Sequence, residues 1–338
     1  MKKYLFITIS AALALTACTN ETTEYVGDTQ AREIAFAPLT QKATRAAVDG
    51  TAFPTDMTME VAAYDATNSG EFFAHTTFTY DSEKAVTESP DTYNAWAGGK
   101  YWPFSPVTIN FLAYAGLNSE TGSGAAWGET GETPLPEAAK VVLTMSENKT
   151  AQGDLMYACG TGSVTQDGST SALTFPTRVP MTFKHAQSLI KFHVTAGSDA
   201  TASNLTINNI KVNSVSTSGT FTVTHTNYNG TSSQSVDGAW SSPGTAGDVI
   251  LSAQTGFTFN TTGADFASLL VVPSGNVPSF TINYTLDSKN YSYTYTPATA
   301  ALAKATKYLY NITITLHEIL VTPSVENWGN GGGNITVG

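Results

Sequence analysis

The side chains that could catalyse a reaction are scattered along this sequence. None of its five histidines stands at zinc-ligand spacing from another or from Cys159. The acidic residues form no pattern that would pair two carboxylates for glycoside hydrolysis, and no nucleophile elbow, Walker loop or dinucleotide-binding motif occurs. The glycine-rich segment 329–334 has no strand-to-helix context, so we expect a flexible tether there. The sequence therefore predicts no enzyme, no metal and no cofactor.

Cys18, at the end of an N-terminal apolar segment, is the most specific chemical signal. Lys2 and Lys3 precede the apolar run 4–14, which has signal-peptide length and is short for a bilayer span. The run ends in Leu-Thr-Ala-Cys, which is similar to the lipobox of bacterial lipoproteins, where the cysteine is acylated and begins the mature chain. We therefore expect residues 1–18 to form a lipoprotein signal peptide with lipid on Cys18. An ordinary secretory peptide that loses Cys18 is the alternative.

Arg45 is a candidate cleavage site for an arginine-specific protease. The chain has only three arginines, Arg32, Arg45 and Arg178, and Arg45 stands among small residues after a candidate strand. Small neighbours let an extended segment enter a protease cleft, so we expect cleavage between Arg45 and Ala46. Arg32 is the alternative site, and a solvated loop charge is the alternative interpretation of Arg45.

The low and acidic charge of the chain limits its partners. Charged residues make up 13% of the sequence, the net charge is -11 and the sequence pI is about 4.8. This balance argues against nucleic acid and anionic membrane as partners, so we expect membrane contact only through a lipid anchor. If Cys18 carries lipid, Cys159 has no partner for an internal disulfide, and we expect it to be a small buried hydrophobe. An intermolecular bridge is the alternative.

Alternating apolar and polar residues predict strands almost throughout the chain. β-Branched and aromatic residues dominate these segments, and Gly, Pro, Asn and Ser separate them. Strands at this spacing indicate sandwiches or open barrels, so the predicted fold class is all-β. The clearest segments are 59–64, 72–80, 107–115, 188–196, 204–212, 219–225, 267–273, 280–286, 291–296 and 308–316.

The chain divides into a processed N-terminus and a body long enough for two domains. We expect a propeptide over 19–45 that contains a strand, an N-terminal domain over 46–180 and a C-terminal domain over 181–338. The boundary follows a loop-like approach at 167–180, after which the strand pattern resumes.

Aromatic residues offer a possible sugar-binding surface. The densest stretch is 94–104, which we interpret as a hairpin whose aromatic side chains cap the end of a sandwich; a glycan platform is the alternative. The candidate tryptophans are Trp96, Trp102, Trp127, Trp240 and Trp328.

The sequence resembles the Bacteroidales fimbrillins, the subunits of type V pili. The resemblance covers nearly the whole chain and lies in the order and spacing of several segments. It implies two tandem transthyretin-like β-sandwich domains of antiparallel strands, lipoprotein export to the outer surface, cleavage after an arginine and polymerisation by strand exchange. The segments are the lipobox at Cys18, 32–38, 42–46, 181–194, 268–274 and 305–332.

Strand exchange assigns roles to the two ends of the chain. We expect 33–39 to be a removable strand of the N-terminal domain, with Ile34 and Phe36 inward and Leu39 at its end. Its departure after cleavage would expose an apolar groove and two strand edges. Another subunit could fill that groove by β-augmentation. The candidate donor is the C-terminal tail with Ile335 and Val337, and 316–325 is the alternative donor.

The predicted function is therefore a structural subunit of a cell-surface pilus that supports adhesion. Its expected partners are other pilus subunits and an arginine-specific protease, with a host or bacterial surface ligand as a further possibility. The expected location is the outer membrane and the fimbria, with the precursor held by lipid on Cys18. The first alternative is a surface adhesin or glycan-binding lipoprotein that does not polymerise or lies at the pilus tip. The second is a surface enzyme that degrades glycans.

Overall fold

The protein is built from β-strands, most of which pair with antiparallel neighbours. No α-helix occurs among the residues that the computed structural model describes, and none of its helical segments there has the length and apolarity to cross a membrane. The described residues are 32–40, 53–88, 91–117, 122–127, 140–145, 153–200, 205–231, 233–275, 277–298, 301–328 and 335–336. The all-β prediction is confirmed for these residues.

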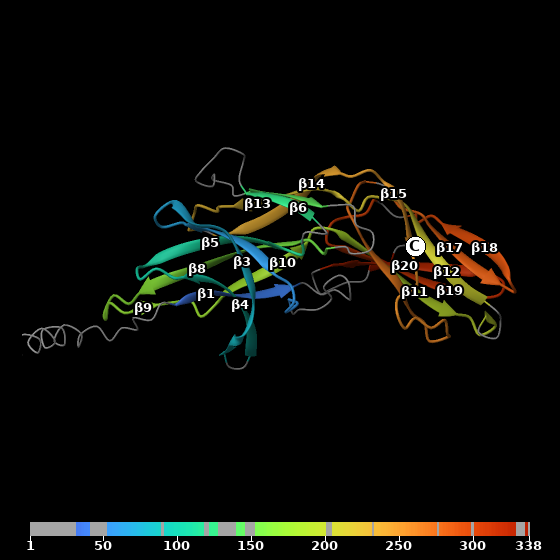
Figure 1. Cartoon of the computed structure of the whole chain (residues 1–338), viewed down its shortest axis with the longest axis horizontal. Coiled ribbons are helices and arrows are strands. Elements are labelled where there is room, and N and C mark those ends of the chain that lie inside the picture. The colour runs from blue at the N-terminus through green and yellow to red at the C-terminus, as the bar shows by residue number, and fades with distance from the viewer. Residues whose placement is uncertain are drawn as a thin grey trace, which may run out of the picture.

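The first part of the chain forms an eight-stranded sheet that closes on itself (Figure 1). Closure occurs at β10, which pairs in parallel with β1 and antiparallel with β8. The order is β10-β1-β4-β3-β2-β5-β8, and β9 extends β8 outside the ring. The strands are β1 (Glu33–Thr40), β2 (Met59–Asp65), β3 (Gly70–Glu88), β4 (Asp91–Tyr101), β5 (Val107–Ala115), β8 (Met156–Gln166), β9 (Leu173–Thr174) and β10 (Val179–His185).

Alternation explains why this sheet closes around an apolar interior. In β10 the side chains of Val179, Met181 and Phe183 are buried, and the residues between them face outward. The other strands send Phe, Met, Ile and Val side chains into the same cluster. This barrel-like ring differs from the first of the two sandwiches that the resemblance implies, because β10 bonds on both sides and joins the two halves of the sheet.

A second sheet covers the outside of the ring. Its order is β14-β13-β7-β6, and it joins strands from both halves of the sequence. Phe221 and Val223 of β13 pack against Leu112 of β5 and Tyr157 of β8 in a cluster separate from the ring interior. The strands are β6 (Gly122–Trp127), β7 (Lys140–Met145), β13 (Gly219–Thr226) and β14 (Ser235–Pro243).

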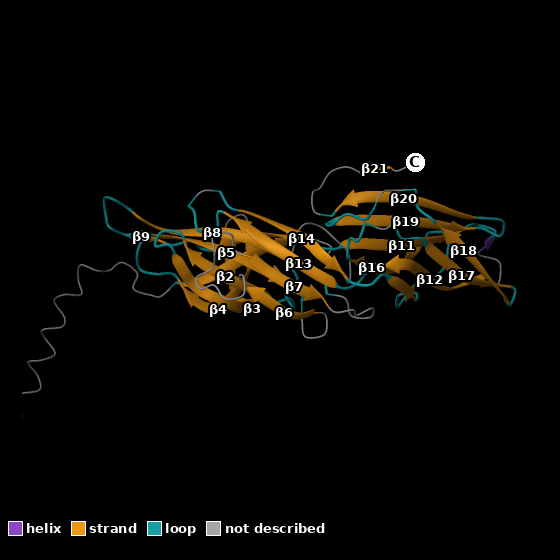
Figure 2. Ribbon diagram, turned by 90° about the horizontal axis from the view of Figure 1, so that it is seen from above, coloured by secondary structure: helices purple, strands orange, loops and turns teal. Residues whose placement is uncertain are grey.

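The C-terminal body is a sandwich of two sheets with one apolar core (Figure 2). Phe192, Tyr310 and Phe280 come from the two sheets and meet in that core at ring distances of 4.8–5.7 Å. One sheet contains β16 (Ala264–Val271), β11 (Ser188–Ala196), β19 (Thr306–Ile314), β20 (Ile319–Asn327) and β21 (Ile335–Thr336), in that order. The other contains β15 (Gly247–Leu251), β12 (Leu205–Val215), β17 (Phe280–Leu286) and β18 (Lys289–Tyr295).

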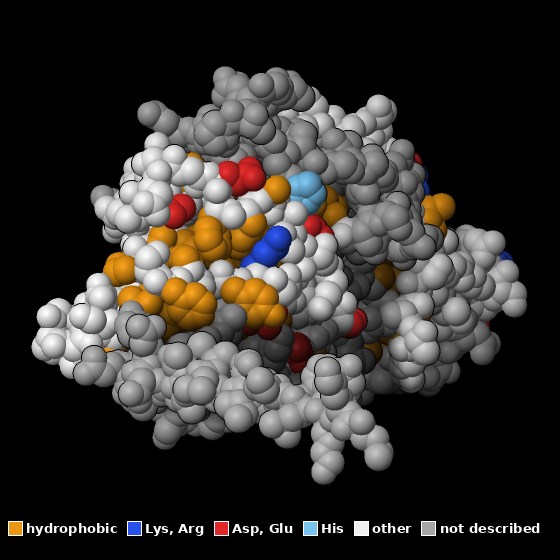
Figure 3. All heavy atoms as spheres, turned by 60° about the vertical axis from the view of Figure 1, so that its left-hand side comes forward, with side chains coloured by type: hydrophobic (Ala, Val, Ile, Leu, Met, Phe, Trp, Pro, Cys, Tyr) orange, Lys and Arg blue, Asp and Glu red, His pale blue; other side chains and the backbone are white. Residues whose placement is uncertain are grey.

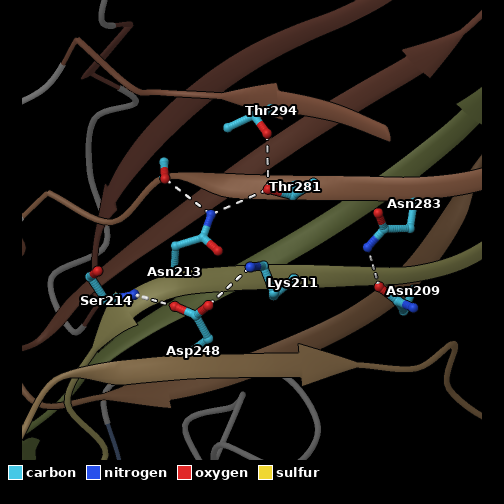
Figure 4. Close-up of polar contacts among 9 residues, drawn as sticks. Asn209, Lys211, Asn213, Ser214, Asp248, Thr281, Asn283 and Thr294 are labelled. Atoms are coloured by element: carbon cyan, nitrogen blue, oxygen red, sulfur yellow. Dashed lines mark hydrogen bonds and ion pairs between the residues drawn. The ribbon is translucent and has the colours of Figure 1, made fainter. Parts of the chain in front are cut away.

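In the sandwich, the outer face of the β15-β12-β17-β18 sheet carries amide and hydroxyl side chains (Figure 4). Asn283 donates to Asn209 at 2.7 Å across β17 and β12, and Lys211 pairs with Asp248 at 2.9 Å across β12 and β15. Successive side chains of a strand point to opposite faces, so the apolar residues next to these polar ones along each strand point into the core. Neutral polar residues thus fill exposed positions that charged residues occupy in most proteins, which accounts for the low charge content.

The predicted domain boundary at residues 180 and 181 lies inside β10. That strand belongs to the ring, and the sandwich begins with β11 at Ser188. The β13–β14 hairpin then returns from the second half of the sequence to the ring. Local sequence patterns reveal neither the pairing of β10 within the ring nor the packing of the β13–β14 hairpin on it, because both join segments that are far apart in the chain.

The predicted hairpin over 94–104 is wrong. Residues 91–101 form the single strand β4, and Trp96 points into the ring core. Trp102 follows the strand and is also buried, so neither tryptophan can serve as an exposed glycan platform. Cys159 is half-buried beside the covering sheet, and burial raises the pKa of its thiol.

Candidate functional site

Strand β1 bridges two other strands of the ring. Glu33, Ala35 and Phe36 pair with β4, and the residues from Phe36 to Thr40 pair with β10. Phe36 is therefore registered with both neighbours, opposite Trp96 and Val179. Pro38 lies in the part that pairs with β10 and has no N–H to donate, which removes one possible ladder bond. The connection between β4 and β10 thus depends on one strand with a short ladder on each side.

The side chains of β1 complete the aromatic core of the ring. Ile34 and Phe36 are fully buried. The Phe36 ring meets the Phe78 ring at 4.8 Å and the Phe111 ring at 5.0 Å, both in edge-to-face geometry. Burying a side chain of this size is worth about 1.5–3 kcal/mol. Without β1, the ring would expose an apolar slot lined by phenylalanines.

Local contacts fix the start of β1. The backbone N–H of Trp102 donates to the carbonyl of Arg32 at 2.8 Å, and the N–H of Gly99 donates to Oε1 of Glu33 at 2.8 Å. Gly99 has a φ of 67°, a conformation that glycine adopts without the strain of a side chain. The Arg32 guanidinium lies 5.9 Å from the centre of the Phe175 ring. The strand thus begins at a defined place on the ring.

The chain re-enters the described structure at Phe53, which is buried in the same core. The Phe53 ring meets the Trp96 ring at 5.2 Å and the Phe183 ring at 4.8 Å. Residues 41–52, with Arg45 and Ala46, lie outside the described residues. The expected cleavage site is therefore between two segments that the ring core holds separately.

The C-terminal strands lie at the edge of the sandwich. β20 pairs with β19 along its whole length, and among the residues that the structure describes its other side pairs with β21 only at Ser324 and Val325. Ile319, Val321 and Val325 are partly buried against the core, whereas Leu320 is 55% exposed. The candidate donor residue Ile335 pairs opposite Val325 in the short strand β21, and Val337 lies outside the described residues.

A buried stack joins the ring to the end of β20. The His185 ring lies parallel to the Trp328 ring at 3.7 Å, and its Nδ1 is 2.9 Å from Oδ1 of Asp154. All three residues are buried, and Trp328 also packs against Leu189 and Leu270. Within the described part of the chain, Nε1 of Trp328 has no hydrogen-bond partner. The stack thus connects β10, the last strand of the ring, to the C-terminal end of the described sandwich.

A sequence model of a fimbrillin-like family matches residues 44–328. The chain belongs to the fimbrillin-like family. The match begins beside Arg45 and ends at Trp328, so it leaves β1 outside and includes both members of the buried stack. No curated protein sequence matches the chain significantly.

Solved structures similar to this fimbrillin-like chain include proteins from Bacteroides and Porphyromonas species. A candidate cell adhesion protein from Bacteroides ovatus ATCC 8483 is 15% identical, with 90% of this chain and 100% of that chain covered and a TM-score of 0.49. A fimbrial protein from Bacteroides vulgatus ATCC 8482 is 15% identical, with coverages of 87% and 99% and a TM-score of 0.46. The fimbrial anchor protein Mfa2 from Porphyromonas gingivalis is 10% identical, with coverages of 89% and 99% and a TM-score of 0.36.

The structure brings some predicted site residues of this fimbrillin-like chain together. Ile34 and Phe36 point into the ring, as expected for the strand, and the backbone of Leu39 continues β1. Cys18 lies outside the described residues, so its lipidation stays a prediction. Sequence reasoning missed the contact of Asp154 with His185, because the two residues lie 31 positions apart and only the closure of the ring joins them.

Proposed function

We propose that this fimbrillin-like chain is a subunit of a cell-surface pilus that supports adhesion and has no catalytic role. In this proposal the precursor is exported as a lipoprotein with lipid on Cys18 and placed at the outer membrane. An arginine-specific protease cuts after Arg45, β1 leaves the ring and a strand of another subunit replaces it. Family membership supports the pilus assignment. The observation that carries the mechanism is that β1 lies between β4 and β10 and pairs with both.

The position of the cut determines what can leave. Cleavage after Arg45 separates β1 from Phe53, which the rings of Trp96 and Phe183 keep in the core. The N-terminal piece then consists of the lipid-bearing propeptide with β1 at its end. A cut at Arg32 would leave β1 attached to the ring, so Arg45 is the site that this geometry favours.

The vacant site selects a strand as its replacement. Departure of β1 unpairs backbone groups on both β4 and β10, and an unpaired strand edge is a template for another strand. The loss of Ile34 and Phe36 from the core costs about 1.5–3 kcal/mol for each side chain. An incoming strand with alternating large apolar residues recovers both contributions. The free energy lost when β1 leaves is therefore close to the free energy gained from the incoming strand, once the cut has removed the covalent link.

The donor comes from the C-terminal end of a neighbouring subunit. Ile335 and Val337 alternate as a donor strand requires, and β21 holds Ile335 by a short ladder. If that tail is too short, β20 is the alternative donor, because its other side has two registered pairs among the described residues. Groove and donor lie in different bodies, so the contact between subunits is head-to-tail and builds an open filament.

A terminal role in the pilus is the second candidate function. β21 contains only Ile335 and Thr336, which is short for a strand that must fill the groove vacated by β1. A subunit at the tip needs the groove but no donor, and its exposed loops are then free to bind a surface ligand. Assembly of the purified chain with itself separates the two roles, since a tip subunit caps a filament and does not extend one.

The test is the N-terminus of the protein recovered from the cell surface. We expect a mature chain that begins at Ala46 and forms ladders on gels. Arg45→Ala should give a folded, lipid-bearing monomer that does not assemble, whereas the matched variant Arg32→Ala should assemble normally. Normal assembly of Arg45→Ala, or a mature chain that begins at Cys18 in all surface material, would overturn the proposed processing.

A further inference from the structure

An exposed aromatic patch lies at the end of the ring where β1 begins. Tyr101 is 50% exposed and Phe104 is 55% exposed, although most other aromatic residues of the ring are buried. In Figure 3, which brings this end of the ring forward, hydrophobic side chains gather with a Lys or Arg side chain among them. We define the aromatic patch as Arg32, Tyr101, Phe104 and Phe175.

Three members of the patch are in contact, and Tyr101 lies beside the start of β1. The Phe104 ring meets the Phe175 ring edge-to-face at 6.1 Å, and the Arg32 guanidinium lies 5.9 Å from the centre of the Phe175 ring. Tyr101 is registered opposite Glu33, the first residue of β1. The polypeptide therefore enters the ring through the middle of the patch, which combines aromatic side chains with a permanent positive charge.

The chain that precedes Arg32 ties this patch to the proposed lipid anchor. Only fourteen residue steps separate Cys18 from Arg32, and a fully extended chain of that length spans at most about 50 Å. The end of the ring therefore stays close to the bilayer for as long as the lipid on Cys18 is inserted. Such a tether raises the local concentration of the patch at the surface to about the millimolar range, where weak contacts are populated.

We propose that the aromatic patch rests on the lipid surface of the outer membrane in the anchored precursor, a second membrane contact beside the lipid anchor, which the sequence predicts as the only one. The proposal depends on the lipidation of Cys18 within the proposed function. Tyrosine and phenylalanine insert into the interface between acyl chains and headgroups, and arginine pairs with lipid phosphate. The patch presents both kinds of side chain on the end that the tether reaches first.

This orientation has a consequence for processing. β1 runs away from the patch for eight residues, which corresponds to about 26 Å of extended strand. A chain that rests on the patch therefore holds Thr40, the last residue of β1, away from the lipid, and the proposed cleavage site follows Thr40 in the sequence. Once β1 leaves the ring after the cut, the body is released from the tether, and Arg32 stays behind with the anchor. The patch therefore contacts lipid in the precursor and loses both the tether and its charge in the mature subunit.

Quenching of a tryptophan by brominated lipid tests the proposal. The acylated precursor with Phe104→Trp is placed in phosphatidylcholine vesicles with brominated acyl chains, and its emission is compared with that of the parent chain. The matched control is Leu320→Trp, an equally exposed position on the other body. We expect Phe104→Trp to lose more emission than the parent chain does, and Leu320→Trp to lose no more than the parent chain does. Equal quenching of the two variants, or no quenching of Phe104→Trp, would overturn the inference.

Two further arms test the tether and self-association of the patch. Cys18→Ala combined with Phe104→Trp should lose the quenching at the same protein concentration; retained quenching would contradict the role of the tether. A blue shift of the Phe104→Trp emission that rises with protein concentration without lipid would show that a second copy covers the patch, and would overturn the inference.

The mass of the acylated chain is measured first. If Cys18 carries no lipid, the lipoprotein proposal fails; if it does and quenching is absent, only the lipid contact fails.

Discussion

Strands β1 and β20 lie near the two ends of the chain and are held in opposite ways. β1 bridges β4 and β10 and buries Phe36 among aromatic rings. β20 runs along β19 for its whole length, and its other side pairs, within the described part of the chain, with β21 at Ser324 and Val325 alone. The first strand is therefore held by ladders on both sides and by side chains in a closed core, whereas the second is held mainly by one ladder with β19.

This difference explains how one chain could both accept and donate a strand. Removal of β1 opens a closed ring and leaves an apolar slot between two unpaired edges, so only another strand restores it. Removal of β20 or β21 leaves a sandwich with one new sheet edge. Sandwich proteins commonly have such open edges. In the proposed strand exchange, the ring is the acceptor and the sandwich is the donor.

Phe36→Ala in the uncleaved chain should give the largest effect. The substitution leaves a cavity beside Phe78 and Phe111, and we expect a loss of about 3–5 kcal/mol in the free energy of unfolding. The matched variant Val321→Ala removes a partly buried side chain from β20 and should cost about 1 kcal/mol. Denaturant unfolding of both variants measures the difference. Equal losses would show that the two strands are held alike.

Acid should weaken the covering sheet of the ring. Burial lowers the pKa of His225 from 6.5 to about 4, and neither ring nitrogen has a hydrogen-bond partner in the described part of the chain. In the unfolded state the His225 side chain therefore binds a proton below about pH 6.5, whereas in the folded state it stays neutral until about pH 4. The free energy of unfolding should fall by up to about 1.4 kcal/mol per pH unit in that window.

Substitution separates this histidine from the others. His225→Leu should flatten the pH dependence between 6.5 and 4, and unfolding of the variant across that range measures it. His317→Gln, at an exposed position of the sandwich, should leave the dependence unchanged. An unaltered slope in His225→Leu would contradict the assignment of the acid sensitivity to the ring and its covering sheet.

Trp328→Phe tests the stack that joins the two bodies, with a smaller effect. The variant keeps an aromatic ring on His185 but leaves a void beside Leu189 and Leu270, for which we expect about 1–2 kcal/mol. No hydrogen bond should be lost, because Nε1 has no partner in the described residues. Calorimetry should show the sandwich destabilised more than the ring. A loss as large as that of Trp328→Ala would show that the indole N–H is needed.

Leu320→Ser should have the smallest effect. The side chain is exposed on β20 and lies outside the core, so the expected change in the free energy of unfolding is within about 0.5 kcal/mol. Thermal unfolding checks this expectation. A loss similar to that of Val321→Ala would mean that the outer side of β20 is covered in solution, and would weaken the comparison between the two strands.

Local sequence patterns predicted individual strands well and their assembly poorly. Alternation placed Ile34 and Phe36 on the inner side of a strand, because period-2 burial is a property of the segment itself. The parallel pairing of β1 with β10 joins Phe36 to Val179 across more than a hundred residues, and no local pattern encodes it. Closure of the ring therefore could not be predicted from the sequence.

The junction between the bodies shows the same limit. Sequence reasoning singled out the segments that contain His185 and Trp328, but gave no sign that the two rings stack. Asp154 follows a segment without a clear strand pattern, and its role depends on burial beside His185. Contacts of this kind arise from tertiary packing, which the order of residue types in one chain does not specify.

Mass analysis of assembled filaments tests the central claim most directly. In the proposed function, β1 leaves the ring after cleavage and a strand of a neighbouring subunit takes its place. Filaments assembled from cleaved protein should therefore contain chains that begin at Ala46 and no peptide that includes residues 33–45. Filaments that retain this peptide in equal amount with the cleaved chain would contradict the account, because the site beside Phe78 and Phe111 would never have been vacated.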